Sequence, residues 1–135
     1  MTVTELEYYH IAEIQIDTAI DLFNESNFIC AITLAAAGEE ILGKLLPPFE
    51  EKAMDKLAKS VLSLAPELSD KEIKDNYLNL VKNGFKHIVN ALCEQDIDIK
   101  LQAIQYIARA CTNYISLRAD LTKKMRAFSD AHPGN

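Results

Sequence analysis

The sequence is poor in the residues that interrupt helices and build tight turns. Only four glycines and four prolines occur among 135 residues, and tryptophan is absent. A β-sandwich or β-barrel needs many short strands joined by turns rich in glycine and proline, so this scarcity argues against such folds. Apolar residues make up 49% of the chain, which is enough for one core. We therefore expect a single all-α domain of ordinary size.

The chain also lacks an excess of basic residues. Its 14 lysines and arginines are outnumbered by 20 aspartates and glutamates, which gives a formal net charge of -6. Nucleic acids are bound by clustered Lys and Arg, so this balance disfavours a nucleic-acid-binding surface. The three cysteines, Cys30, Cys93 and Cys111, are widely spaced and form no C-x-x-C pair. Each lies in an apolar stretch, so we predict buried, reduced thiols and a cytoplasmic location.

We also expect no targeting segment and no membrane-spanning segment. Residues 1–7 are acidic and lack the basic start and apolar run of a signal peptide. The longest nearly uncharged run, 28–38, is much shorter than the roughly 20 residues that a membrane-spanning helix needs. The sequence thus predicts no association with a membrane.

Apolar residues recur at spacings of three and four along most of the chain, which predicts amphipathic helices. We expect helices at about 4–23, 27–46, 49–64 and 69–93, and a fifth that follows Asp96 or Asp98 and fades near residue 121. Short connections favour antiparallel neighbours. The predicted fold class is therefore an antiparallel up-and-down bundle of four or five helices. Residues 1–128 form its single domain, and residues 129–135, with His132, are expected to be a disordered tail.

The predicted helix 27–46 is unusual because it has almost no polar face, which predicts burial on several sides. Its small residues would let neighbouring backbones come close; they are Ala31, Ala35 and Gly38. Glu39 and Glu40 interrupt this helix, and a buried carboxylate is costly unless it is paired. Either one of them meets His87 or Lys82 in a cleft, or the helix end has reached solvent, where Glu40 would pair with Lys44. We favour solvent for Glu40 and leave both interpretations open for Glu39.

The predicted fifth helix has apolar residues on two sides. A seam of alternating three- and four-residue spacing is expected to face the core; it consists of Ile97, Leu101, Ile104, Ala108, Cys111 and Ile115. The opposite side is expected to be exposed and to offer surface for a second subunit; it carries Tyr106, Ala110, Tyr114 and Leu117. The helix is also locally basic, with Lys100, Arg109 and Arg118. These residues either complement the helix dipole or face a phosphate.

A polar strip lies beside the core stripe of the predicted fourth helix. At about 100° per residue, one flank collects four amides and an imidazole: Asn76, Asn79, Asn83, His87 and Asn90. This strip is either a polar groove or hydrogen-bonded subunit interface, or a solvated helix flank.

The segment K-N-G-F-K-H at 82–87 resembles the R-N-x-x-x-H signature of HEPN domains, and residues 32–46 resemble the second helix of small HEPN-like bacterial proteins. The resemblance implies a small helical bundle that often forms dimers. In active HEPN ribonucleases it implies an Arg and a His facing each other across the dimer cleft, with the His as acid or base on the RNA 2′-hydroxyl. Here Asn83 and His87 match the signature, but Lys82 replaces the Arg and lacks its bidentate fork.

We therefore predict a non-catalytic HEPN-like interaction protein that acts as a homodimer. The alternative is a metal-independent domain that cleaves RNA or binds a nucleotide, with Lys82, Asn83 and His87 as its catalytic residues. In either case the groove would include Asn76, Asn79, Asn90 and Glu39. No cofactor and no metal are expected. His10, Glu13 and Asp17 share one face, but a bundle metal site needs paired E-x-x-H motifs, so we expect a solvated acidic first helix.

Overall fold

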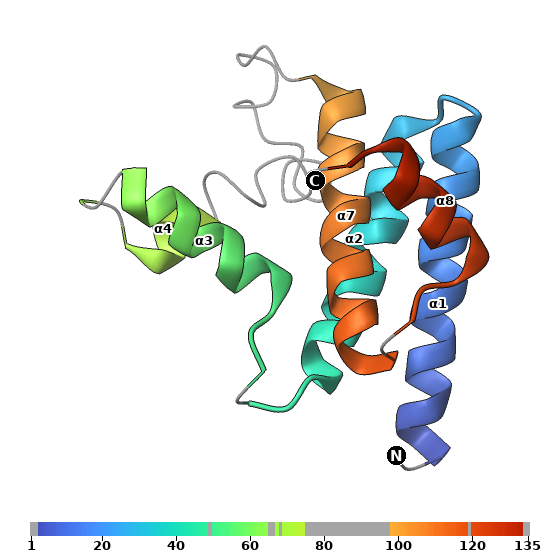
Figure 1. Ribbon diagram of the computed structural model, residues 1–135, viewed down its shortest axis with the longest axis horizontal. Helices are drawn as coiled ribbons and strands as arrows, with labels where there is room; N and C mark the ends of the chain where they lie inside the picture. The colour runs from blue at the N-terminus through green and yellow to red at the C-terminus, as the bar shows by residue number, and fades with distance from the viewer. Residues whose placement is uncertain are drawn as a thin grey trace.

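The computed structural model describes residues 3–48, 50–64, 67, 69–74, 98–118 and 120–133, and these residues contain helices and no strand (Figure 1). The helices are α1 (Val3–Asn24), α2 (Phe28–Leu45), α3 (Ala53–Leu64), α4 (Asp70–Ile73), α7 (Ile99–Arg118) and α8 (Lys123–Ala131). The prediction of an all-α bundle is confirmed. None of the helices described here is long and apolar enough to cross a membrane.

Helices α1 and α2 form an antiparallel hairpin (Figure 1). The chain turns at Ser26, which has a positive φ of 63°, and the Asn27 side chain then accepts a hydrogen bond from the Cys30 amide at 3.3 Å. This bond satisfies one of the free amides at the start of α2. The predicted close approach occurs at Gly38, where an added Cβ would lie only 2.7 Å from Ile16 Cγ1 and 3.3 Å from the Ala12 carbonyl oxygen.

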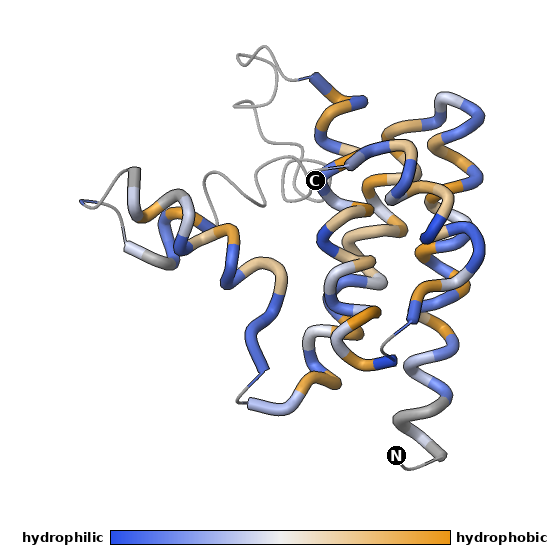
Figure 2. Tube along the Cα trace, viewed as in Figure 1, coloured by the Kyte–Doolittle hydropathy of each residue, from blue (hydrophilic) through white to orange (hydrophobic). Residues whose placement is uncertain are grey.

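The core lies between α1, α2 and α7, along which hydrophobic positions recur (Figure 2). The inward stripe predicted for the first helix is confirmed, because each of its members is buried: Tyr9, Ala12, Ile16, Ala19, Ile20 and Phe23. From α2 the core takes Ala31, Ile32, Ala35, Ala36 and Leu42. Cys30, predicted to be buried, is exposed, whereas Cys111 is buried as expected. Cys93 lies outside the described residues.

The face that α7 buries differs from the predicted one. Leu101 and Ile115 of the expected seam are 45% and 43% exposed. Three residues expected on the outside are buried in the same chain instead: Tyr106, Ala110 and Tyr114. The physical reason is that α7 packs against both α2 and α1, and its buried arc is centred on the residues between these two neighbours. Among the seam residues that the structure describes, only Ile104 and Cys111 are buried, at the edge of that arc. Ile97 lies outside the described residues.

Helix α7 runs parallel to α2, because Arg109 lies beside Glu39 and Asn113 lies beside Gly43. It runs antiparallel to α1 (Figure 1). Since α2 and α7 are parallel, the chain must run back along the bundle after α2 and before α7. The fourth helix, predicted for 69–93, would have to do so. Its opening is confirmed by a capping box, in which the Glu72 amide donates to Ser69 Oγ at 3.1 Å. Residues 75–97 lie outside the described residues, so the alternating up-and-down order stays a prediction.

The C-terminal segment is more ordered than predicted. Residues 129–131, expected in a disordered tail, belong to α8. Thr122 caps this helix by accepting a hydrogen bond from the Met125 amide, and Met125 and Phe128 are buried against the bundle. The centre of the His132 ring then lies 4.6 Å from the centre of the Phe128 ring and 5.4 Å from that of the Phe23 ring. Two apolar anchors and one cap are thus enough to extend the fold beyond residue 128.

Candidate functional site between α2, α3 and α7

Of the residues predicted to form a site, the structure describes Glu39 alone. The candidate catalytic residues Lys82, Asn83 and His87 lie outside the described residues. The same holds for the other predicted groove residues, Asn76, Asn79 and Asn90. The site is therefore built here from Glu39 outwards.

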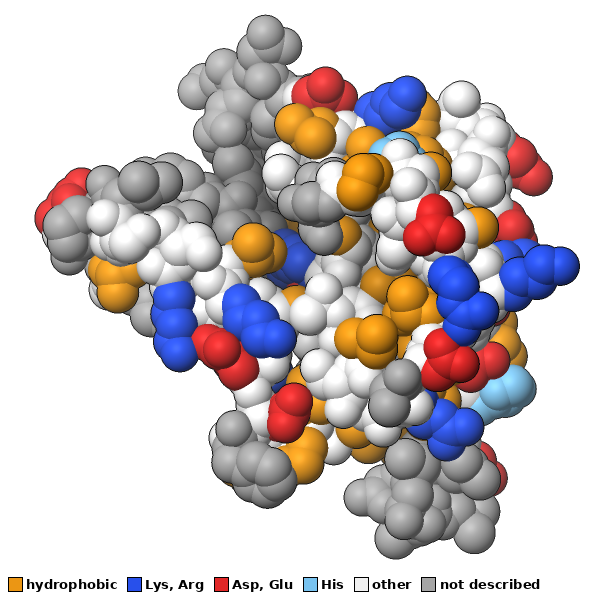
Figure 3. Space-filling model, viewed as in Figure 1, with side chains coloured by type: hydrophobic (Ala, Val, Ile, Leu, Met, Phe, Trp, Pro, Cys, Tyr) orange, Lys and Arg blue, Asp and Glu red, His pale blue; other side chains and the backbone are white. Residues whose placement is uncertain are grey.

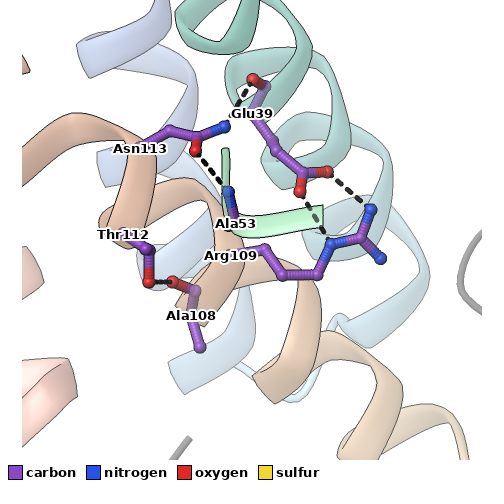
Figure 4. Close-up of polar contacts among 6 residues, drawn as sticks. All are labelled: Glu39, Ala53, Ala108, Arg109, Thr112 and Asn113. Carbon is purple, nitrogen blue, oxygen red and sulfur yellow. Dashed lines mark hydrogen bonds and ion pairs between the residues drawn. The ribbon is translucent and has the colours of Figure 1, made fainter. Parts of the chain in front are cut away.

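Glu39 is buried and forms a two-pronged ion pair with Arg109 (Figure 4). Arg109 Nε donates to Glu39 Oε2 at 2.7 Å, and Nη2 donates to Oε1 at 2.8 Å. The two residues are only 4% and 5% exposed. The guanidinium also lies over the Tyr106 ring, 4.6 Å from its centre. This geometry matches the planar fork of arginine to a carboxylate, and it offsets the cost of taking both charges out of water.

The two sequence-based interpretations of the glutamates have different outcomes. Glu40 is exposed and lies 3.6 Å from Lys44, as predicted for a helix end in solvent. The same interpretation is wrong for Glu39, which is buried. The two roles predicted for Arg109, complementing the helix dipole and facing a phosphate, are both wrong, because its guanidinium is paired with Glu39 inside the bundle.

Asn113, one turn beyond Arg109, joins three helices. Its Nδ2 donates to the Glu39 backbone carbonyl at 3.2 Å, and its Oδ1 accepts from the Ala53 amide at 2.9 Å. Ala53 is the first residue of α3, so a side chain from a distant helix caps α3 in place of a local residue. This cap provides a physical reason why α3 begins at Ala53 and not near the predicted residue 49.

A pocket of about 300 Å³ lies beside this network. Its lining consists of Glu39, Glu40, Gly43, Lys44, Lys52, Met54, Asp55, Lys74 and Asn113. Lys74 Nζ donates to Asp55 Oδ1 at 2.6 Å, and this bond holds the pKa of Asp55 below its usual range. With Lys44 beside Glu40 and Lys74 beside Asp55, most of the lining charge is compensated within the chain. The network therefore acts as a structural clasp between α2, α3 and α7.

The surface around the clasp shows the same balance of charge. Acidic and basic side chains are interspersed over the visible face of the molecule (Figure 3). Near α8, Lys124 pairs with Asp21 and Arg126 pairs with Asp120. Within the described part of the chain, no three His, Cys, Asp or Glu side chains lie where they could hold one metal ion.

The acidic flank of α1 is not the solvated face that was expected. Glu13 accepts a hydrogen bond from the Tyr114 hydroxyl at 2.9 Å, and Asp17 accepts one from the Thr122 hydroxyl at 2.7 Å. Burial raises the pKa of Asp17, although the bond from Thr122 acts in the opposite direction. Of the three residues on this face, only His10 is exposed, whereas Glu13 and Asp17 are partly buried. The flank thus docks α7 and α8 onto α1.

Comparisons with known proteins supply no relative: no family model, no curated protein and no solved structure matches the chain.

Proposed function

We propose that this chain is a HEPN-like interaction protein without catalytic activity, and that it acts as a homodimer. The observation that supports self-association is a group of large apolar side chains on α1. Tyr8, Ile11 and Ile14 are 51%, 44% and 53% exposed, although they lie within two turns of one helix. Large apolar side chains exposed this close together on one helix are typical of protein–protein contacts. A closed pair with two-fold symmetry is the commonest way in which a small protein covers such a patch.

The absence of catalysis follows from the replacement at Lys82, where the HEPN signature has Arg. An ammonium group is a point charge and does not reproduce the two parallel hydrogen bonds that a guanidinium makes to phosphate. The one predicted groove residue that the structure describes, Glu39, has its carboxylate bound to Arg109.

The mass of the protein in solution tests the proposed function. Light scattering coupled to size exclusion, run over a wide range of concentrations, should give twice the 15.1 kDa of the chain. A mass of 15.1 kDa at every concentration would overturn the proposal. Incubation with single-stranded RNA should leave the RNA intact. Cleavage that disappears in His87→Ala would favour the ribonuclease alternative instead.

A further inference from the structure

One flank of α1 has no charged residue and none of the fully buried residues of the core. Ala12 and Ile16 face α2, and the flank towards α7 and α8 carries Glu13 and Asp17. At about 100° per residue, the remaining flank next to α2 carries residues at spacings of three and four: Tyr8, Ile11, Gln15, Thr18 and Leu22. Three of them are exposed and two are partly exposed.

A similar stripe lies on α2. Gly38 faces α1, and Glu39 with Gly43 faces α7. Beyond Gly38, on the side away from α7, apolar residues again recur at spacings of four and three: Cys30, Leu34, Ala37, Ile41 and Leu45. Each of them is exposed or partly exposed, so α2 keeps a second apolar stripe in addition to the one that it buries.

The two stripes form one continuous surface. Because α1 and α2 are antiparallel and meet through Gly38 and Ile16, both stripes lie on the same side of this contact, opposite to α7. Leu22, Leu34, Ile41 and Leu45 pack their inner atoms against the core, which links the surface to the interior. We call this surface the α1–α2 face.

We propose that the α1–α2 face pairs with the same face of a second copy of the chain, so that four helices meet around a two-fold axis. The inference rests on the proposed function and specifies its interface. Charge is the reason why a second copy fits. A two-fold contact places identical surfaces against each other, and each chain has a net charge of -6, so a charged patch would repel its own copy. Both stripes avoid that repulsion, because neither contains an acidic or basic residue.

Charge introduced at Ala37, in the middle of the α2 stripe, tests the face. Glutamate and lysine are both good helix formers, so Ala37→Glu and Ala37→Lys should fold. Each variant alone should dissociate into monomers, with the dimer dissociation constant raised about a hundredfold, since like charges would meet across the axis. An equimolar mixture of the two variants should restore a dimer with one chain of each kind. Native mass spectrometry distinguishes that pair from either variant alone.

Gln105 provides the matched control, because it is exposed on α7, away from the α1–α2 face. Gln105→Glu and Gln105→Lys should leave the dimer unchanged. A dimeric wild-type protein whose Ala37 variants stay dimeric would overturn the α1–α2 face while leaving the proposed homodimer in place. A monomeric wild-type protein would overturn both. If, in addition, Ala37→Glu lost its helical circular dichroism, a segment of the same chain would be the occupant of the face.

Discussion

The two sides of α2 reverse the usual relation between polarity and burial. Towards α7, the helix buries a charged residue, Glu39, together with the charge of Arg109. On the opposite side of the α1 contact, it leaves Leu34 and Ile41 partly exposed. A charge is stable inside this bundle because its partner supplies two hydrogen bonds in good geometry. A stripe of apolar groups on the outside is stabilised further when another surface covers it.

The difference between these sides indicates two kinds of specificity. The clasp of Glu39, Arg109 and Asn113 fixes the positions of α7 and α3 on α2, because its hydrogen bonds are directional and form in only one arrangement of the helices. The α1–α2 face has no such directional bonds, and the lack of charge on it restricts the partner to another uncharged surface. Breaking the clasp should therefore destabilise the fold, whereas altering the face should only separate its copies.

The largest expected effect comes from removing the arginine of the clasp. Arg109→Leu keeps a good helix former in α7 but leaves the Glu39 carboxylate buried without its partner. We expect a loss of about 3–5 kcal/mol in the free energy of unfolding, because an uncompensated buried charge is far more costly than a missing contact. Urea denaturation followed by circular dichroism measures this loss.

The double variant Glu39→Leu with Arg109→Leu tests the cause of that effect. Replacing both charges by apolar groups should recover most of the lost stability, since a buried ion pair is often no better than a packed apolar pair. A loss below about 1 kcal/mol for Arg109→Leu alone would contradict the central role of the clasp.

The second prediction concerns the contact that separates the two sides of α2. Gly38→Ala would place a methyl group 2.7 Å from Ile16 Cγ1, a fully buried side chain with little room to move. Overpacking of this kind costs about 1–3 kcal/mol, and the gain in helix propensity of about 1 kcal/mol offsets part of it. We expect a net destabilisation of about 1 kcal/mol, measured by thermal and urea denaturation.

Gly43 is the matched control, on the side of α2 that faces α7. A Cβ there would lie 3.5 Å from Asn113 Nδ2 and 3.7 Å from Lys52 Cδ, which are ordinary contact distances. Gly43→Ala should therefore be neutral or stabilising through helix propensity. If both substitutions changed the free energy of unfolding by the same amount, the close packing of α1 on α2 would not be the reason for a glycine at position 38.

The sequence predicts well those elements whose pattern allows one orientation. The stripe of α1 is unambiguous because acidic residues such as Glu13 and Asp17 lie beside it, and every predicted core position there is buried. The fifth helix has apolar residues on two sides, and the periodicity alone does not say which side meets the neighbours. In the structure, the side with Tyr106 and Tyr114 is buried, because α7 packs against both α1 and α2.

The candidate site was predictable only in part, because its partners are distant in the chain. A carboxylate in the apolar second helix indicates that a buried cation is needed, but Arg109 lies 70 residues away from Glu39. Nothing in the spacing favoured it over Lys100 or Arg118. The tail was missed for a related reason. Thr122, Met125 and Phe128 have the spacing of a cap followed by two anchors, yet the segment is too short for a strong periodic signal.

The smallest expected effect concerns Asp17, a partly buried carboxyl that lacks the arginine fork of Glu39. Burial raises its pKa above the ordinary value of 3.8, so the folded state loses stability as the pH rises through the raised pKa. Asp17→Asn keeps an oxygen that can accept from Thr122 and should be slightly more stable than the wild type at neutral pH. The difference should vanish in acid, where Asp17 is protonated.

Asp120→Asn is the control of opposite sign, because a hydrogen bond from Arg126 lowers the pKa of Asp120. It should be slightly destabilising at neutral pH. Urea denaturation of both variants along a pH series measures the change in the free energy of unfolding that each substitution causes. Changes of the same sign at neutral pH would contradict the distinction between a buried carboxyl and a paired one.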